Sequence, residues 1–376
     1  MTAPRELICF GEDWDRHPTT AQFLVQHLLG QFRVIWINSL GWRTPRLSRA
    51  DLVRVLSKLR SAAGGAKRPD PNLIVYTPLV IPWYRSASVR RLNARRLCGV
   101  IHALARRHGF AHYSLMTTYP AAAEIFQQMS GVRRIYYCAD EYTTRPELEP
   151  ALVRSLEATL LSAVDVVVTT SQALFDLKSA VHPHVVYLPH GVDVPRFAKA
   201  ADPATPIPDE VQGLPRPVIG FHGLIGNLID FDIIDSIARR RPDWSVVMLG
   251  PTSGDVSSLP RRRNIYYIGE RPHHELPAYL RAFDVCLMPY RLVPALFYAN
   301  PVKLREYLAA GKPIVSTRVP EALQFGELLQ IANSSDEFVP KIERCLSEDP
   351  SLPAQRMASV RNQTWAARAA ELAAVL

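Results

Sequence analysis

The sequence has few cysteines, and none of them is paired by spacing. The five cysteines stand far apart, at positions 9, 98, 138, 286 and 345, without a CxxC motif or the Cys/His spacing of zinc sites. We therefore expect neither a disulfide framework nor a structural zinc. Cys9, Cys138 and Cys286 lie within apolar runs and are predicted to be inert core thiols.

Long hydrophobic segments are also missing. No window approaches the ~18–20 uncharged apolar residues that a membrane-spanning helix needs. The first ten residues lack the basic segment and apolar stretch of a secretory signal. We expect a cytoplasmic protein whose contact with a membrane is peripheral, at the inner face of the cell membrane.

Acidic residues are scarce in one part of the chain. Residues 1–110 hold 18 Lys and Arg against 6 Asp and Glu, a formal charge of +12, whereas the whole chain of 376 residues carries +9. One half is therefore strongly basic and the remainder slightly acidic. This asymmetry indicates an anionic partner, which can be a nucleic acid, a membrane surface or a phosphorylated substrate.

Both halves show the alternation of strands and helices that is typical of parallel sheets. Short β-branched runs, such as 133–140 and 218–222, alternate with amphipathic stretches, such as 87–107 and 150–161. Five prolines within 202–217 interrupt this rhythm and predict a linker. We expect domains at 1–201 and 218–353, then a terminal helix in 354–376 that can pack back on the first domain. The fold class is α/β, with two doubly wound domains facing each other across a cleft.

A glycine-rich loop follows the first strand of the second half. Gly220, Gly223 and Gly226 form a GxxGxxG pattern rather than the GxGxxG of dinucleotide-binding proteins, and no acidic residue ends the next strand. NAD binding is therefore disfavoured. The glycines can let backbone amides approach a phosphate or a sugar, or they can form an ordinary strand-to-helix turn.

A strand ending at Tyr290 and a helix after Asn300 and Pro301 carry the most informative pattern. Lys303 and Glu306 share one face near the start of that helix, which Gly311 ends. A lysine at a helix N-terminus suits a diphosphate, and a carboxylate suits the two hydroxyls of a ribose. The alternative for this pair is a surface ion pair.

These motifs resemble the nucleotide-sugar-binding half of GT-B glycosyltransferases. The resemblance rests on NPVKLREYLAAGKPIVST at 300–317, DVCLMPY at 284–290 and LPHGVD at 188–193, and the match is specific from about Tyr136 to Glu321. The second half of the chain is similar to bacterial enzymes of exopolysaccharide and teichuronic-acid assembly and, more distantly, to xanthan-type glucuronosyltransferases.

The resemblance implies roles for particular residues on the donor side. Glu306 would hold the donor ribose, Lys303 the diphosphate, and the glycine loop around Gly223 the phosphates or the sugar. The backbone near Glu270 and Arg271 would meet the base, and Tyr290 and Asn300 are further donor contacts. One family glutamate is replaced by Tyr298, which leaves the donor sugar and the stereochemical outcome open.

On the acceptor side, the strand at 133–140 runs into two adjacent carboxylates, Asp140 and Glu141. One of them can act as a general base toward an acceptor hydroxyl. We choose Asp140, because it aligns with an aspartate that resembles the catalytic base of the xanthan-type glucuronosyltransferases. Capping of the following turn is the alternative role. Glu141 is a predicted acceptor contact, as are Asp13, Trp14 and His17 in a loop that can also simply cap a helix.

We predict no metal and no cofactor. Asp13–Asp15 and Asp230–Asp232 match the DxD pattern of transferases with another fold, and the second pair is better explained as a helix cap. His273 and His274 are adjacent but lack a third ligand at helical spacing.

Arginines that alternate with aromatic residues favour an anionic membrane over nucleic acid as the partner of the basic half. Arg90, Arg91, Arg95 and Arg96 are the predicted membrane-facing residues, and no nucleic-acid-binding motif accompanies them. A solvated basic face is the alternative.

The combined interpretation is a metal-independent glycosyltransferase that uses a nucleotide diphosphate sugar, with UDP as the expected nucleotide. Its acceptor would be a glycan or a polyprenyl-diphosphate-linked sugar. A nucleotide-sugar epimerase or hydrolase, and a catalytically silent membrane scaffold, are the alternatives.

Overall fold

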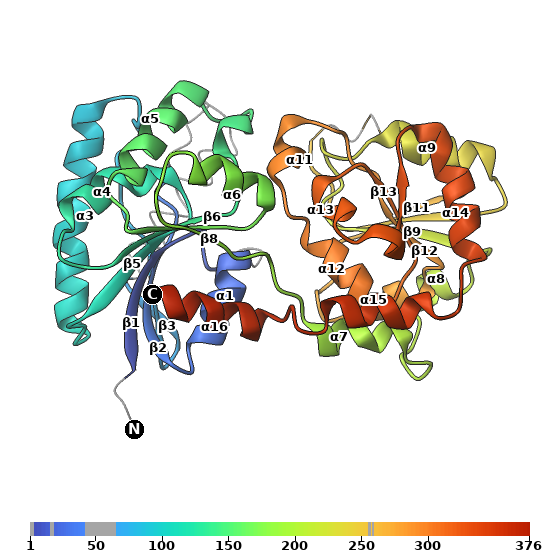
Figure 1. The fold of residues 1–376 in the computed structure, drawn as a ribbon, viewed down its shortest axis with the longest axis horizontal. Coiled ribbons are helices and arrows are strands. Elements are labelled where there is room, and N and C mark those ends of the chain that lie inside the picture. The colour runs from blue at the N-terminus through green and yellow to red at the C-terminus, as the bar shows by residue number, and fades with distance from the viewer. Residues whose placement is uncertain (1–3, 16–18, 42–64, 255–256, 258) are drawn as a thin grey trace. The chain divides into compact units, whose positions relative to one another are not determined.

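The structure is a computed structural model that describes residues 4–15, 19–41, 65–254, 257 and 259–376. The chain forms two compact units (Figure 1). Unit 1 comprises Met1–Pro189 together with Arg368–Leu376, and unit 2 comprises His190–Ala367. Both units are built on a largely parallel sheet, as the alternation of apolar runs and amphipathic stretches predicts.

The sheet of unit 1 has the strand order β3-β4-β2-β1-β5-β6-β7-β8. All neighbouring pairs are parallel except β3 and β4, which form an antiparallel edge. The strands are β1 (Arg5–Phe10), β2 (Phe32–Ile37), β3 (Lys67–Asp70), β4 (Leu73–Tyr76), β5 (Tyr113–Thr117), β6 (Arg134–Cys138), β7 (Val166–Thr169) and β8 (Val185–Tyr187).

Helices lie on both sides of this sheet (Figure 1). They are α1 (Thr20–Leu28), α3 (Ala87–Arg107), α4 (Ala123–Gln128), α5 (Pro150–Leu161), α6 (Gln172–Ser179) and the end of α16 (Trp365–Val375), with short 3-10 turns η1 (Pro120–Ala122) and η2 (Tyr142–Thr144). The chain terminus is fastened to the sheet of unit 1, because Arg5 Nη1 and Arg133 Nε donate to the carbonyls of Ala373 and Val375 at 2.7 Å each.

The sheet of unit 2 has the order β11-β10-β9-β12-β13-β14, and all its pairs are parallel. Its strands are β9 (Val218–His222), β10 (Ser245–Leu249), β11 (Ile265–Gly269), β12 (Val285–Met288), β13 (Ile314–Thr317) and β14 (Gln330–Ala332). Its helices are α7 (Val194–Ala198), α8 (Asp209–Gln212), α9 (Phe231–Arg240), α10 (Leu276–Ala282), α11 (Pro294–Tyr298), α12 (Val302–Ala309), α13 (Pro320–Leu323), α14 (Phe338–Leu346) and α15 (Leu352–Val360), with 3-10 turns η3 (Lys199–Ala201), η5 (Gly326–Leu328) and η6 (Ser335–Glu337).

The core of unit 2 explains one glycine of the predicted loop. Every residue of β9 is buried, and the Phe283 ring lies where a side chain on Gly220 would stand, within 2.1 Å of an ideal Cβ. Gly220 is therefore required by packing between the sheet and the chain before β12, because a close-packed interior leaves no room for an added methyl group.

The predicted bounds of α3, α5, α9 and β9 agree with the structure, whereas the edge strands β3 and β14 and the helix α14 are additional. The division between the units falls at Pro189/His190, earlier than the expected linker. The proline-rich stretch lies within unit 2, since it contains α8 and its Val211 is buried in the core of that unit.

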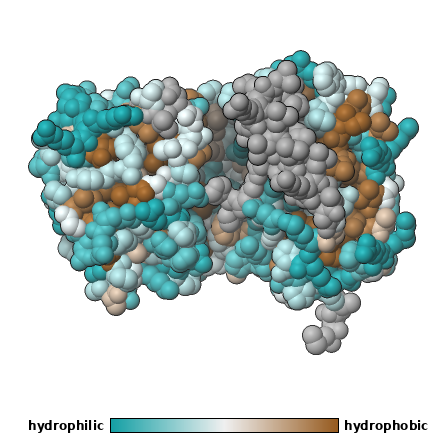
Figure 2. All heavy atoms as spheres, turned by 180° about the vertical axis from the view of Figure 1, so that it is seen from behind, coloured by the Kyte–Doolittle hydropathy of each residue, from teal (hydrophilic) through white to brown (hydrophobic). Residues whose placement is uncertain are grey.

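All five cysteines are free and buried, in agreement with the expected core thiols. Among the helices in the described ranges, none is both long and apolar enough to cross a membrane. On the face drawn in Figure 2, apolar patches show through a mostly polar surface in both units.

Candidate active site

Each unit has a point at which the strand order reverses. In unit 2, β9 lies between β10 and β12, and the chain leaves β9 toward one side of the sheet and β12 toward the other. Ligands of open parallel sheets bind outside the carboxyl ends of the strands at this position. The loop after β9, with Gly223, and the segment after β12, with Tyr290, are therefore the expected borders of a site.

The loop after β9 is held close to the loop after β10. Gly223 N donates to Leu249 O at 2.8 Å, and Gly223 and Gly250 have φ values of +130° and +143°. A Cβ on Gly250 would stand 2.0 Å from Gly223 O. Both glycines are thus required, by backbone conformation and by contact.

Lys303 lies against this loop. Its Nζ donates to Tyr290 Oη at 2.5 Å, is 5.1 Å from the centroids of the Phe221 and Tyr290 rings, and would be 2.9 Å from a Cβ on Gly223. Three predicted donor residues, Gly223, Tyr290 and Lys303, are therefore together. The i,i+3 ion pair between Lys303 and Glu306 is not formed.

Helix α12 presents Lys303 and Glu306 and has the predicted ends. Pro301 is its N-cap, and Gly311, with φ of +67°, follows its last turn. Because α12 begins beside the loops after β9 and β12, its N-terminal amides give a local positive potential at the site.

Glu306 is buried and held by two histidines. His273 Nε2 donates to Glu306 Oε1 at 3.0 Å, and His222 Nε2 lies 3.3 Å from Oε2 without making a hydrogen bond. Burial alone would raise the pKa of Glu306, but the hydrogen bond from His273 and the nearby positive charge of Lys303 outweigh it, so the pKa is lowered. Glu306 is an ionised acceptor.

The same cluster keeps His222 neutral. Burial is the largest cause that lowers the pKa of His222 to about 4; Glu306 opposes it, and Lys303 and His273 add to it. A buried imidazole thus stands beside an ionised carboxylate, with its Nε2 unpaired.

A chain of contacts behind His273 sets its orientation. Arg196 Nη1 lies 2.8 Å from His273 Nδ1, and a guanidinium can only donate, so Nδ1 accepts and the ring proton stays on Nε2, where Glu306 accepts it. Arg196 is in turn paired with Asp193 at 3.1 Å. LPHGVD and His273 are visible in the sequence, but no local spacing predicts this arrangement, because it joins residues that are distant in sequence.

The side chains of Asn300 and Arg271, both predicted to contact the donor, bind other residues of the protein. Asn300 is buried, and its Oδ1 accepts from Arg305 Nη1 at 2.5 Å. Arg305 also forms a buried ion pair with Glu321 at 2.7 Å, so Asn300 supports the base of α12. The guanidinium of Arg271 is paired with Glu210 on α8 at 2.8 Å, and contact of the backbone at Glu270 and Arg271 with a base stays a prediction.

In unit 1, Asp140 follows the carboxyl end of β6. Its side chain is 43% exposed, and Oδ2 accepts from Arg145 Nη2 at 2.7 Å. Arg145 lies over the Tyr142 ring, with 5.3 Å between the guanidinium carbon and the ring centroid. A carboxylate that is open to solvent can accept a proton from a hydroxyl.

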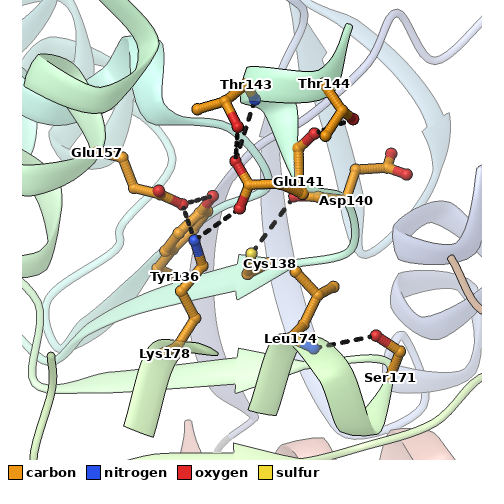
Figure 3. Close-up of polar contacts among 10 residues, drawn as sticks. All are labelled: Tyr136, Cys138, Asp140, Glu141, Thr143, Thr144, Glu157, Ser171, Leu174 and Lys178. Atoms are coloured by element: carbon orange, nitrogen blue, oxygen red, sulfur yellow. Dashed lines mark hydrogen bonds and ion pairs between the residues drawn. The ribbon is translucent and has the colours of Figure 1, made fainter. Parts of the chain in front are cut away.

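Glu141 points the other way (Figure 3). It caps η2, accepting from Thr143 N at 3.1 Å, and pairs with the buried Lys178 at 3.1 Å. Burial opposes ionisation, but the bonds from Thr143 and Lys178 lower the pKa of Glu141. Glu141, and not Asp140, therefore caps the turn that follows β6. Its carboxylate is turned into unit 1 rather than toward a solvent-exposed acceptor.

Lys178 completes a buried cluster that the sequence did not reveal. Its Nζ lies 2.8 Å from Glu157 Oε1, which also accepts from Tyr136 Oη at 3.0 Å. One cation between two carboxylates satisfies groups that would be costly to bury alone. The cluster fixes the backbone from which Asp140 projects.

The loop after β1 is attached to the end of β2. Asp13 Oδ1 accepts from Ser39 Oγ at 2.9 Å, Trp14 N donates to Asn38 Oδ1 at 2.9 Å, and the Trp14 ring meets Trp36 edge-on at 4.9 Å. This loop is at the reversal point of the unit 1 sheet, where β1 lies between β2 and β5. His17 lies outside the described residues.

Within the described residues, no group of three or more His, Cys, Asp or Glu side chains is arranged to hold a metal ion. Asp230 caps α9, its side chain accepting from Asp232 N at 3.1 Å, as expected for the second DxD match. The need for a metal is not decided by these observations, and metal independence stays a prediction.

The four arginines predicted to face a membrane are not equivalent. Arg91, Arg95 and Arg96 are exposed on α3. The prediction that Arg90 faces a membrane is wrong. The guanidinium of Arg90 pairs with Glu124 at 2.5 Å and donates to Tyr84 O at 2.7 Å, with a side-chain exposure of 14%, so it joins α3 to α4 instead of facing outward.

Comparisons with known proteins agree with this geometry. Residues 217–348 match the family of glycosyl transferases group 1. TuaH of Bacillus subtilis (strain 168), a glycosyltransferase named for teichuronic acid biosynthesis, is 29% identical over 273 residues, which cover 67% of this chain and 68% of TuaH.

Solved structures show the same fold. Sucrose-phosphate synthase from Thermosynechococcus elongatus has a TM-score of 0.67 at 14% identity, covering 99% of this chain and 98% of its own. HepE of Anabaena, in complex with UDP and glucose, has a TM-score of 0.67 at 13% identity, with 98% of each chain covered.

Two Rossmann-like units with parallel sheets, and the likeness to these solved structures, define the GT-B class of fold. The match of residues 217–348 to the group 1 glycosyl transferases, together with the similarity to TuaH, indicates that the protein is a glycosyltransferase.

Proposed function

We propose that this protein transfers a sugar from a UDP-sugar to a hydroxyl of a lipid-linked or growing glycan, in the biosynthesis of a cell-surface polysaccharide. The observation that carries this proposal is the arrangement of Lys303, Gly223 and Glu306 at the carboxyl edge of the unit 2 sheet. The name of TuaH supports the class of pathway, and UDP in the HepE structure supports the nucleotide.

The donor residues would divide the nucleotide between them. Glu306 would accept the two ribose hydroxyls, since each of its oxygens has lone pairs beyond those facing the histidines. The Lys303 ammonium and the N-terminus of α12 would stabilise the negative charge that grows on the diphosphate as it departs. The backbone at Glu270 and Arg271 would meet the base.

The acceptor residues would supply the base. The acceptor hydroxyl oxygen would attack the anomeric carbon while the bond from that carbon to the diphosphate oxygen breaks, and the hydroxyl proton would pass to Asp140. Arg145 Nη2, 2.7 Å from Asp140 Oδ2, would orient the carboxylate. No resident metal is needed in this proposal because Lys303 meets the leaving group.

The decisive experiment is a thermal-shift screen of the protein with UDP-, GDP- and dTDP-sugars, followed by a transfer assay with the nucleotide that binds. A ligand that binds only the native state raises the unfolding temperature. UDP-sugars are expected to give the largest shift. Conversion of the donor without an acceptor would indicate an epimerase or hydrolase instead, and no nucleotide binding would indicate a silent scaffold.

We further propose that unit 1 binds the inner face of the cell membrane near the N-terminal half of α3. Exposed apolar side chains at Leu79, Trp83 and Leu92, which are 51%, 65% and 47% exposed, accompany the exposed Arg91 and Arg95. Apolar groups beside cations are typical of proteins on anionic lipid surfaces.

A liposome assay tests this surface. Arg91 and Arg95 lie one turn apart on α3, and replacing both with Gln should weaken binding to anionic vesicles about tenfold or more, since each cation contributes ~1 kcal/mol near such a surface. The control removes two exposed arginines of unit 2, Arg261 and Arg263. Equal binding by the two double variants would contradict a membrane role for α3.

A further inference from the structure

A small basic pocket lies in unit 1, away from all the residues assigned above. It encloses about 250 Å³ and is lined by four basic side chains and by Asn72 and Phe110. The basic residues are Arg33, Arg68, Arg107 and His108. They belong to the strongly basic stretch of the first 110 residues, which the proposed transfer reaction does not use.

The pocket is at the amino edge of the unit 1 sheet. Arg33 is the second residue of β2, Asn72 directly precedes β4, and Arg107 is the last residue of α3. The loop with Asp13 and the segment with Asp140 follow the carboxyl ends of strands in the same sheet. The pocket and the acceptor residues are therefore at opposite edges of one sheet.

Two of the guanidinium groups are fixed by neutral partners. Arg33 donates to the carbonyls of His108 and Gly109, and its guanidinium carbon is 4.7 Å from the centroid of the Phe110 ring. Arg68 donates to Pro71 O through Nε at 3.2 Å and Nη2 at 2.6 Å. Carbonyl groups and an aromatic ring orient these cations but do not neutralise them.

The positive charge of the pocket exceeds its negative charge. Among the described residues, Glu6 forms an ion pair with these arginines, with Oε1 3.5 Å from Arg33 Nη1, and its other oxygen accepts from the amides of Ala111 and His112. A second carboxylate, Asp70, accepts from the amide of Asn72 at 2.8 Å. The guanidinium of Arg107 has neither a hydrogen bond nor an ion pair with any described residue. Three guanidinium groups are thus accompanied by two carboxylates, Glu6 and Asp70, and Arg33 is the one of the three that forms an ion pair within the described residues.

The pKa of His108 reflects this excess of positive charge. Burial and then the charges of Arg107, Arg68 and Arg33 lower the pKa of its imidazole. Like charges held together at the rim of a cavity destabilise one another, and an anion between them would remove that repulsion.

We propose that this pocket is a second ligand site, which binds a phosphate group. A guanidinium fork matches two phosphate oxygens at once, and Arg107 and the unused N–H groups of Arg33 and Arg68 supply such forks. The volume is below the ~300–1,000 Å³ of ordinary small-molecule pockets. It suits one phosphate or a diphosphate, carried by a free small molecule or by a lipid headgroup, and not a whole nucleotide.

The test is calorimetric titration with inorganic phosphate and with pyrophosphate, at physiological salt and with saturating UDP present to occupy the proposed donor site. Arg107→Ala is the informative variant because Arg107 supports no other described residue. We expect it to weaken binding about tenfold, as the loss of one charge-assisted contact does.

Arg106→Ala is the matched control. Arg106 is exposed in the same last turn of α3 but does not line the pocket, so it has the same favourable interaction with the helix C-terminus. The affinity of Arg106→Ala for phosphate and pyrophosphate should stay within about twofold of that of the parent protein, because a distant surface charge is screened by salt. Equal affinities for the two variants, or no phosphate binding by the parent protein, would overturn the proposal.

A second measurement identifies the site directly. Proton NMR of the His108 ring should show its pKa rising when pyrophosphate is added, because the anion offsets the three arginines, and this rise should be smaller in Arg107→Ala. A pKa that pyrophosphate leaves unchanged would place the bound anion elsewhere and overturn the assignment.

Vesicles distinguish the two sources of the phosphate. Phosphatidylcholine vesicles with and without phosphatidic acid are compared for recruitment of Arg107→Ala and Arg106→Ala. A specific loss of recruitment in Arg107→Ala assigns a lipid headgroup, and equal recruitment with intact pyrophosphate discrimination assigns a free phosphate; each supports the site. UDP-sugar binding is read separately, so failure here leaves the proposed transfer reaction untouched.

Discussion

The two carboxylates proposed to carry the reaction differ in how their units hold them. In unit 2, the side chain of Glu306 is 9% exposed, lies next to His273 and His222, and is influenced by the positive charge of Lys303. In unit 1, the side chain of Asp140 is 43% exposed and has one charge partner among the described residues, Arg145. A group that binds the same ribose in every cycle benefits from rigid positioning, whereas a base must stay open to its acceptor.

The backbone beneath Asp140 is nevertheless rigid. Glu141, the next residue, is locked by Lys178 and Thr143, so the side chain of Asp140 is open while its Cα is fixed. Unit 2 holds the carboxylate of Glu306 itself in place, whereas unit 1 holds the backbone at Asp140 in place and leaves its carboxylate open. The following predictions test this contrast.

The largest effect is expected for Asp140→Asn. Loss of a general base should lower turnover by about 10³-fold, within the range of 10²–10⁴ for such catalysis, while calorimetry shows nearly unchanged UDP affinity. Glu147→Gln is the matched control, because Glu147 contacts the same Arg145 at 3.8 Å. Near-normal turnover in Asp140→Asn would remove Asp140 from the mechanism.

Lys303→Met should be next. Removal of a cation that meets the leaving diphosphate is expected to lower kcat/KM by about 10²-fold and to weaken UDP binding. Tyr290→Phe removes the hydroxyl contacted by Lys303 but keeps the charge, so it should change kcat/KM much less. If both variants lose the same activity, Lys303 acts through Tyr290 and not through the diphosphate.

The positioning of Glu306 by His273 should have a moderate effect. His273→Phe removes the N–H that Glu306 accepts and should raise the donor KM about tenfold with little change in kcat, the magnitude of one hydrogen bond to a charged group. His273→Gln can donate again and should recover much of the loss. A failure of Gln to improve on Phe would reduce His273 to a packing role.

The smallest effect is a change in stability with pH at His222. The folded pKa of about 4 is below the ordinary 6.5, so only the unfolded chain is protonated there between these values. Stability from the neutral form is present above about pH 6.5 and is lost as pH falls toward 4. His222→Phe should therefore gain about 1 kcal/mol over the parent protein on moving from pH 7.5 to 5.5.

Chemical unfolding at the two pH values measures this difference. The edge contact with Tyr307, at 4.9 Å, can be kept by a phenyl ring, so the variant is expected to fold. A pH dependence equal to that of the parent protein would mean that His222 is solvated in the native state, and the contrast between a closed donor site and an open acceptor site would be weaker.

The sequence could predict features that depend on neighbours along the chain. Pro301 and Gly311 bound α12 because a proline fixes the start of a helix and a glycine adopts the left-handed conformation that ends it. Hydrophobic patterning gave α3, α5, α9 and β9 their correct ranges. The short edge strands β3 and β14 escaped prediction, since few residues carry the pattern.

The tertiary structure decided which polar side chains meet. Arg196, His273 and Glu306 come from three elements and converge in one chain of hydrogen bonds, which no local spacing specifies. Burial likewise turned Arg90 toward Glu124 and Asn300 toward Arg305. Local periodicity fixes the backbone element and its buried face, but the partner of a long polar side chain depends on packing between elements that the chain brings together only when it folds.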